Sequence, residues 1–309
     1  MQTFLPYPDF RQSAAALDTA RLGKQRVEAL QILRALTIPE YGWASHPAVR
    51  MWMGHVPALT MYGLAMVDEW TKRGHPDNTR ENITEFAPQA AHPAYVDKIP
   101  MPYWLGDKNF HRGHRSNLLR KDATFYGEAF TDVQPDLEYV WPDPRMEIIP
   151  EEPEEDFLWI LRNPHPEVTP ETLTTVALPA ARSALRAQAV AEITEAQRDA
   201  KLQALEISRR PLPKVRRGPK PKEKKPTRKR QIQNEQFATL PGKTTLAVPF
   251  DDGAKFALGF VHGRPITLED GRFGRDFTVE KVFERSAFDQ PALLQDPRVF
   301  FKVPAPELG

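Results

Sequence analysis

Apolar residues recur at helical spacing in the first part of the chain. On a helix that turns by about 100° per residue, one side of residues 17–37 is apolar and carries Leu22, Ala29, Leu33 and Leu36. The other side is polar and carries Arg21, Lys24, Gln25, Glu28 and Gln31. Arg26 breaks the pattern because it falls among leucines, where a solvated cation is out of place. We therefore predict an amphipathic helix whose carboxylate, Glu28, is surrounded by cations.

Two further helices are expected before residue 142. The first covers residues 57–73 and ends at Gly74, the residue type that closes helices. The second covers residues 108–121 and places His111, His114, Arg115 and Leu118 on one face. Between them, the proline-rich residues 88–102 indicate a surface loop. Together these patterns predict a compact, mainly α-helical domain over residues 1–142.

The rest of the chain changes character several times. Residues 143–168 are acidic and proline-bearing and indicate a linker, residues 169–207 a helical segment, and residues 208–233 a basic, disordered tether. Residues 234–309 hold short β-type runs (TTLAVPF, AKFALGFVHG, RPITLED and DFTVEKVF) between turn signals. We expect a mainly α N-terminal domain and a small β-rich C-terminal domain of unknown role, joined by a helical and disordered basic linker.

Composition narrows the class of protein. The chain has no cysteine, which excludes disulfides, thiolate metal sites and cysteine nucleophiles. Its apolar runs fall short of the ~18 residues that span a bilayer, and the first ten residues lack the basic and apolar regions of a signal peptide. We expect a cytoplasmic protein with no membrane partner.

The formal net charge of +1 conceals a concentrated basic segment. Residues 209–230 contain twelve Lys and Arg and one Glu, a net +11, so the remainder of the chain sums to −10. Such a run is either a solvated spacer or a phosphate-binding segment whose binding depends on salt. Within it, RRGPKPK resembles a loose AT-hook, and its cations are expected to contact DNA: Arg216, Arg217, Lys220 and Lys222.

Two helices offer candidate chemistry. Glu28 among cations suggests an electrostatic site for an anion, although Lys24 and Glu28 at i, i+4 could equally form a surface ion pair. In the helix at 108–121, a metal shared by His111 and His114 lacks a third ligand at a recognisable spacing, so no metal is expected. Phosphate contact suits the polar residues of this helix better, namely His111, His114, Arg115, Asn117 and Lys121; a plain surface helix is the alternative.

Residues 1–142 resemble the pyrimidine-dimer DNA glycosylase family of the endonuclease V type. The resemblance lies in LDTARLGKQRVEALQIL, HPAVRMW, AMVDEWTKRGHPD, FHRGHRSNLLRKDATFYG and the closing YVWP. It implies a helical domain that binds double-stranded DNA, cleaves a glycosidic bond and nicks the strand without a metal or cofactor. In that family the α-amine of the chain attacks C1′ and forms a Schiff base, and β-elimination follows.

The resemblance also implies roles for particular residues. Glu28 occupies the position of the family's catalytic glutamate, and Arg21 and Arg26 match the region that grips phosphates around the lesion; Lys24 is expected to contact DNA beside them. Because Gln2 is too large for normal excision of the initiator methionine, we expect the Met1 amine to be the nucleophile. An α-amine, whose pKa is typically about 7.7–8.0, has a useful neutral fraction at physiological pH.

We therefore expect a nucleoid-associated DNA repair glycosylase with AP-lyase activity on damaged duplex DNA, with pyrimidine dimers as the expected lesion. Two alternatives stay open at this stage. One is a nonenzymatic DNA-binding or architectural protein that retains the fold. The other is an enzyme that acts on another modified or abasic site.

Overall fold

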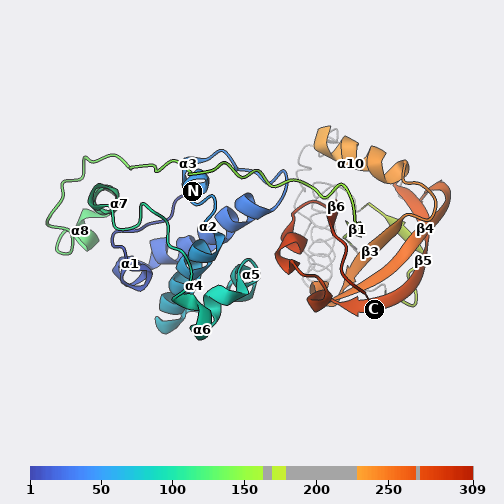
Figure 1. The fold of residues 1–309 in the computed structure, drawn as a ribbon, viewed down its shortest axis with the longest axis horizontal. Coiled ribbons are helices and arrows are strands. Elements are labelled where there is room, and N and C mark those ends of the chain that lie inside the picture. The colour runs from blue at the N-terminus through green and yellow to red at the C-terminus, as the bar shows by residue number, and fades with distance from the viewer. Residues whose placement is uncertain (163–168, 179–227, 269–271, 309) are drawn as a thin grey trace, which may run out of the picture. The chain divides into compact units, whose positions relative to one another are not determined.

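The computed structural model describes residues 1–162, 169–178, 228–268 and 272–308 (Figure 1). They form two units. The first contains Met1–Phe157, Ser286–Arg298 and Lys302–Gly309, and the second contains Leu158–Arg285 and Val299–Phe301. Residues 179–207 of the expected helical segment and most of the basic tether lie outside the described residues, including Arg216, Arg217, Lys220 and Lys222.

The first unit is helical, as its sequence pattern predicts. The three expected helices are confirmed as α2 (Thr19–Thr37), α4 (Val56–Lys72) and α7 (Lys108–Lys121). The unit also contains shorter helices, which the pattern does not reveal: α1 (Phe10–Ala16), α3 (Pro47–Arg50), α5 (Arg80–Thr84), η1 (Pro88–Ala91), α6 (Pro93–Val96) and α8 (Ala123–Tyr126). The expected loop at 88–102 thus begins with two single turns of helix.

Aspartates fix where the main helices begin. The Asp18 carboxylate accepts the backbone N–H of Arg21 at the start of α2, and Asp107 accepts that of Phe110 at the start of α7. Asp9 does the same for α1. Each carboxylate satisfies a donor that the first turn of a helix leaves unpaired, which stabilises a helix by about 1 kcal/mol.

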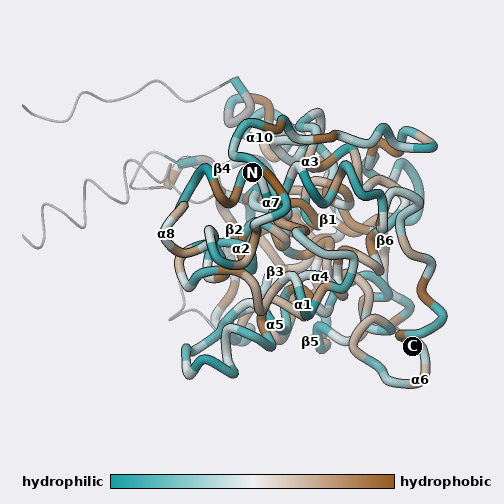
Figure 2. Tube along the Cα trace, turned by 90° about the vertical axis from the view of Figure 1, so that its left-hand side faces the viewer, coloured by the Kyte–Doolittle hydropathy of each residue, from teal (hydrophilic) through white to brown (hydrophobic). Residues whose placement is uncertain are grey.

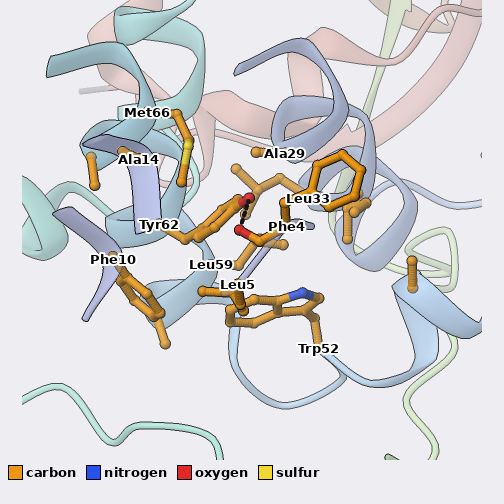
Figure 3. Close-up of a cluster of buried hydrophobic side chains, with 14 of the residues drawn as sticks. Phe4, Leu5, Phe10, Ala14, Ala29, Leu33, Trp52, Leu59, Tyr62 and Met66 are labelled. Atoms are coloured by element: carbon orange, nitrogen blue, oxygen red, sulfur yellow. Dashed lines mark hydrogen bonds between the residues drawn. The ribbon is translucent and has the colours of Figure 1, made fainter. Parts of the chain in front are cut away.

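The core of the first unit lies between α1, α2 and α4. Figure 3 shows the Phe4 and Leu5 side chains inside this cluster, with Trp52 and Tyr62 beside them. Gly63 permits α4 to lie close to its neighbours, because an added Cβ would be 3.1 Å from Ile83 and 3.4 Å from Ala29. The amino end of the chain is therefore part of the hydrophobic core.

The second unit is built on a mixed six-stranded sheet in the order β2-β5-β4-β3-β1-β6. Strands β3 to β5 are antiparallel neighbours, whereas β1 is parallel to β3. Helix α10 packs against β5. The strands are β1 (Phe157–Leu161), β2 (Thr175–Ala177), β3 (Thr245–Phe250), β4 (Lys255–Thr267), β5 (Phe273–Glu284) and β6 (Phe300–Pro304).

Four expectations from the sequence differ from the observed secondary structure. The acidic linker expected at 143–168 contains β1, whose FLWIL run pairs with β3 of the expected β-rich domain. The expected helix start near 169 is a turn followed by β2, where β-branched residues favour a strand. The tether ends in α10 (Arg228–Ala238). Finally, residues 255–267, which join the runs AKFALGFVHG and RPITLED, form the single strand β4, because the presumed turn between the runs is a bulge opposite β5.

Hydrophobic residues are spread along the chain and interspersed with hydrophilic ones (Figure 2). Among the described residues, no helix has the length and apolar character that crossing a membrane requires.

The first unit is completed by a segment from near the chain's end. The side-chain amide of Gln295, in η4 (Pro291–Gln295), donates to the Asn82 carbonyl and the Glu85 carboxylate at 2.8 Å each. Its Oε1 accepts from the Arg34 guanidinium at 3.0 and 3.1 Å. The expected β-rich domain at 234–309 therefore contributes residues 286–298 to the helical unit.

Candidate functional site

The amino end of the chain lies on the polar side of α2. The Gln2 backbone N–H donates to Glu28 Oε2 at 3.1 Å, and the Phe4 N–H donates to Gln25 Oε1 at 2.9 Å. Gln25 is fully buried and Glu28 is 7% exposed. Two residues of the helix face that the sequence marks as polar, Gln25 and Glu28, are thus covered by the amino-terminal segment instead of facing solvent.

Gln25 holds the Glu28 carboxylate in place. Its Nε2 donates to Glu28 Oε2 at 3.0 Å, and its Oε1 accepts the Tyr62 hydroxyl at 2.5 Å. Burial raises the pKa of Tyr62 well above its usual value, and the nearby Glu28 charge raises it further. Tyr62 is therefore a neutral donor at physiological pH, which fixes the orientation of the Gln25 amide.

Helix α7 holds the next part of the amino-terminal segment. The Gly106 N–H donates to His111 Nε2 at 3.0 Å, so the His111 proton is on Nδ1, which lies 2.8 Å from the Leu5 carbonyl. His114 Nδ1 faces the Leu5 N–H at 3.4 Å. Burial, with a smaller contribution from His111, lowers the pKa of His114 to about 3. Both histidines are buried and neutral, and they bind backbone.

A pocket of about 570 Å³ opens where these elements meet. Three cationic side chains, from Arg21, Lys24 and Lys121, share its wall with the Glu28 carboxylate. Lys24 Nζ lies 3.3 Å from Glu28 Oε1 and is 72% exposed. The full lining is Met1, Gln2, Phe4, Ala20, Arg21, Lys24, Glu28, His46, Lys121, Tyr139 and Trp141. The pocket therefore combines the chain's amino end, one carboxylate and a surround suited to phosphates.

His46 and Tyr139 form the aromatic side of this pocket. His46 Nδ1 accepts the Ala48 N–H at 3.1 Å and so caps α3. Burial lowers the pKa of His46, and the N-terminal charge lowers it further, against a smaller rise from Glu28. Burial raises the pKa of Tyr139, whose hydroxyl is hydrogen-bonded to the Gln2 side chain. The pKa values of both side chains therefore depend on groups at the amino end: the N-terminal charge for His46 and the Gln2 side chain for Tyr139.

The structure brings only part of the predicted site together. Met1, Arg21, Lys24, Glu28 and Lys121 line one pocket. Arg26 lies apart: its guanidinium stacks 4.3 Å above the Trp70 ring and pairs with Asp77. This buried arrangement explains why a cation occurs among the leucines of α2.

The remaining predicted contacts on α7 are engaged inside the protein. Arg115 donates to the Pro6 carbonyl and to Asp132 at 2.8 Å each. Asn117 Nδ2 donates to the carbonyls of Gly113 and Leu137. These hydrogen bonds, like those of His111 and His114, indicate that the four side chains stabilise the fold and do not contact DNA. Within the described parts of the chain, no three His, Asp or Glu residues are grouped so as to hold a metal ion.

Besides the apolar Phe4 and Ala20, sequence reasoning missed five polar or aromatic residues that line the pocket or position its carboxylate: Gln2, Gln25, His46, Tyr139 and Trp141. His46 directly precedes Pro47 at the start of a short helix, which is a capping signal. Tyr139 and Trp141 lie in the YVWP segment that carries the family resemblance, which gave neither of them a role. The roles of Gln2 and Gln25 depend on contacts with residues distant in sequence.

Comparison with known proteins identifies one family for the amino-terminal part of the chain. Residues 1–82 match the model of the pyrimidine dimer DNA glycosylase family. The family resemblance is thereby confirmed for this segment, and it supports a DNA repair glycosylase in general, with DNA as its partner. No curated protein and no solved structure matches the chain. The matched segment includes Glu28 and His46, while Lys121, Tyr139 and Trp141 lie beyond it.

Proposed function

We propose that this protein is a DNA glycosylase with AP-lyase activity, acting on pyrimidine dimers in duplex DNA through an amine at its amino end. The observation that carries the proposal is the hydrogen bond from the Gln2 backbone to Glu28, which holds the amino end beside a carboxylate. The family match over residues 1–82 supports the same class of reaction.

The reaction follows from the groups in the pocket. The neutral Met1 amine attacks C1′ of the damaged nucleotide, and the C1′–N bond breaks with its electron pair leaving on the base. The resulting glycosylamine, in which C1′ carries the amine nitrogen and the ring oxygen O4′, then loses a proton from nitrogen; the C1′–O4′ bond breaks, O4′ takes up a proton, and a Schiff base forms between the amine and C1′. Removal of a C2′ proton and departure of the 3′ phosphate then cut the strand by β-elimination. No oxidant or reductant is consumed.

Glu28 is suited to assist these steps. As a carboxylate it stabilises the positive charge that develops on the sugar, and it can relay protons to and from the intermediate. Gln25 Nε2 and the Gln2 N–H fix its Oε2, and Lys24 lies beside its Oε1. Arg21, Lys24 and Lys121 provide positive charge for the phosphates that flank the lesion.

The position of the amine depends on whether Met1 is retained. With Met1 present, the backbone nitrogen bonded to Glu28 is that of Gln2, and the free amine lies one residue earlier, near His46. Loss of Met1 would convert the Gln2 nitrogen itself into the free amine at the carboxylate. The mass of the purified protein's amino-terminal peptide distinguishes the two cases.

Borohydride trapping tests the proposal. Reduction of the Schiff base joins enzyme and DNA covalently, and we expect an adduct with dimer-containing and abasic duplexes. Peptide mapping should place the linkage on the amino-terminal residue, and blocking the amine by acetylation should abolish it. Tight duplex binding with no adduct on either substrate would instead identify a nonenzymatic DNA-binding protein. An adduct formed only with other lesions would revise the substrate.

A further inference from the structure

The guanidinium of Arg21 is held by contacts on two sides. Its Nη1 donates to Asp18 Oδ2 at 2.7 Å, and its Nη2 donates at 3.2 Å to the Lys121 carbonyl at the end of α7. Asp122 Oδ2 lies 3.7 Å from the same Nη1. The Arg21 side chain is 24% exposed, whereas that of Lys24, which lines the same pocket, is 72% exposed. Of these two cations, Arg21 is therefore the one that the protein holds more closely.

The two carboxylate oxygens of Asp18 have different partners. Oδ1 accepts the Arg21 backbone N–H at 3.0 Å, and this contact caps α2. Oδ2 accepts the Arg21 guanidinium and the hydroxyl of Tyr126, the last residue of α8. Capping a helix requires only the Oδ1 contact. The contacts of Oδ2 therefore exceed what α2 needs in order to begin, and they act on the Arg21 side chain.

Tyr126 fixes the Asp18 carboxylate from inside the helical unit. It is fully buried, and its ring stacks on Phe130 at a centroid distance of 5.4 Å and an interplanar angle of 5°. Its hydroxyl accepts the Asp18 backbone N–H at 3.0 Å and donates to Oδ2. Burial raises the pKa of Tyr126, so the hydroxyl is a neutral donor at physiological pH. Burial of Asp18 opposes its ionisation, but the hydrogen bonds from Tyr126 and Arg21 outweigh this effect and lower the pKa of the Asp18 carboxyl.

A guanidinium that is already fixed binds an anion more tightly than a mobile one. An arginine side chain gives up rotational freedom when it binds a phosphate, and that loss weakens binding unless folding has already restricted the side chain. Among the described residues, Asp18 and Lys121 accept two of the five N–H donors of the Arg21 guanidinium, which leaves donors for a phosphate oxygen. Because Arg21 lines the same pocket as Glu28, a phosphate bound there lies beside the carboxylate of the proposed reaction.

We propose that Tyr126 and Asp18 are positioning residues, which hold the Arg21 guanidinium in place for a phosphate of the DNA strand beside the damaged nucleotide. The inference rests on the proposed function, since that function puts damaged DNA in this pocket. A cluster that served stability alone would need the cap and the buried tyrosine ring, but not an arginine that lines a pocket. Tyr126 lies beyond the residues that the family model matches, so the support for Arg21 comes from outside that segment.

Asp18→Asn tests the direction of the effect. Asparagine is an equally good cap for α2, but its Nδ2 replaces Oδ2 and cannot accept from Arg21 or Tyr126. Electrostatics alone predicts tighter DNA binding, because a negative charge near the phosphates is removed, whereas loss of positioning predicts weaker binding. The probe is a duplex with a tetrahydrofuran abasic analogue, which cannot form a Schiff base, and fluorescence anisotropy gives Kd. We expect Kd to rise by about threefold, and an unchanged or lower Kd would overturn the proposal.

Two matched controls accompany the variants. Asp9→Asn makes the same change at the cap of α1, outside the pocket, and should leave Kd unchanged. Tyr126→Phe removes only the hydroxyl and should raise Kd by about two- to tenfold. The salt slope of binding should stay the same, because Arg21 keeps its charge. Tyr103→Phe removes a hydroxyl that donates to the Asp143 carbonyl at 2.8 Å outside the pocket, and its Kd should equal that of the wild type.

Arg21→Gln distinguishes positioning from stability. This variant has no guanidinium to hold, so adding Tyr126→Phe or Asp18→Asn to it should no longer raise Kd. Equal rises in both backgrounds would show that the two residues act on stability alone and would overturn the proposal. A Kd that Arg21→Gln leaves unchanged would overturn it as well. Thermal unfolding shows whether each variant is folded at the assay temperature.

Borohydride trapping separates this inference from the proposed function. Trapping by a protein in which Tyr126→Phe and Arg21→Gln act independently on Kd would overturn the positioning role and leave the chemistry intact. Coupled effects on Kd without any trapped adduct would overturn the chemistry and support the positioning role in a DNA-binding protein.

Discussion

The Gln2 backbone nitrogen lies 3.1 Å from Glu28 Oε2, although 26 residues separate the two in sequence. This contact turns the polar face of an amphipathic helix into the floor of a pocket. It also makes the amino end a structural element, because the adjacent Phe4 and Leu5 side chains are buried in the core. The packing of Phe4 and Leu5 in the core therefore fixes the position of the amino end relative to the Glu28 carboxylate.

Replacing Glu28 by Gln should separate chemistry from binding. The amide oxygen can still accept the Gln2 N–H, but the negative charge is removed, so we expect strand cleavage and trapping to slow by about 10²–10⁴-fold. Duplex affinity, measured by fluorescence anisotropy, should change little. Glu69→Gln is the matched control, because Glu69 pairs with Arg73 and Lys72 on α4 outside the pocket. Unchanged cleavage by Glu28→Gln would remove this residue from the mechanism.

His114 should make the folded state sensitive to mild acid. Burial lowers its pKa to about 3 in the folded protein, whereas an unfolded histidine titrates near 6.5. The unfolded state therefore binds the extra proton between these values. This contribution is fully present above pH 6.5 and is lost as the pH falls toward 3, by up to about 1.4 kcal/mol per pH unit.

His114→Asn provides the corresponding measurement. The asparagine oxygen can replace Nδ1 as the acceptor for the Leu5 N–H without taking up a proton. Urea unfolding at pH 7, 6 and 5 should show a smaller loss of stability for this variant than for the wild type. The exposed His92 serves as the control, and His92→Asn should keep the wild-type slope. Parallel slopes for all three proteins would contradict the assignment.

Gly23 should be intolerant of a methyl group. An added Cβ would lie 2.7 Å from Cζ3 of Trp70, the ring on which Arg26 stacks. The ring would have to move, and we expect Gly23→Ala to destabilise the protein by about 1–3 kcal/mol. Gly42→Ala is the control, because an added Cβ there meets nothing within 4 Å. Its free energy of unfolding should stay the same or rise slightly.

The basic segment should contribute to affinity without sequence preference. Changing Arg216, Arg217, Lys220 and Lys222 to Gln should weaken binding to all duplexes by a similar factor. The slope of log K against log salt should become shallower by about 0.9 for each phosphate that the protein no longer neutralises. A variant in which four cations of the second unit are changed to Gln, Lys243, Lys255, Arg264 and Lys281, controls for total charge. An unaltered slope would make the segment a spacer only.

The helices were predictable because their signals are local. α2, α4 and α7 follow from apolar spacing, aspartate caps and a closing glycine, all within the segments themselves. Strand β1 was not predictable in the same way. Its FLWIL run follows a dense group of acidic residues, and only pairing with the distant β3 makes it a strand. The sequence indicated a turn at Gly263, where the backbone does have a positive φ. Because β4 continues its pairing with β5 on both sides, the irregularity there is a bulge and not a turn between two strands.

The candidate site was predictable to a similar extent. Glu28, Arg21 and Lys24 could be found because they share one helix with a recognisable pattern. Arg26 lies on the same helix but breaks its pattern, and its partners Asp77 and Trp70 lie on segments that only the three-dimensional structure brings to it. Gln25 was not recognised as a site residue, although it positions the Glu28 carboxylate. It has the appearance of a surface residue, and its burial follows from where the first five residues of the chain pack.

The contact of Gln295 with Arg34, Asn82 and Glu85 has a consequence for synthesis on the ribosome. The helical unit is discontinuous in sequence, and its piece Ser286–Arg298, which carries Gln295, is complete only 141 residues after Phe157. At about 5–20 residues per second, the unit waits on the order of ten seconds for that piece. During this interval the nascent helices present an unfilled surface around Asn82, which makes Ser286–Arg298 the segment that ends the unit's exposure to chaperones and proteases.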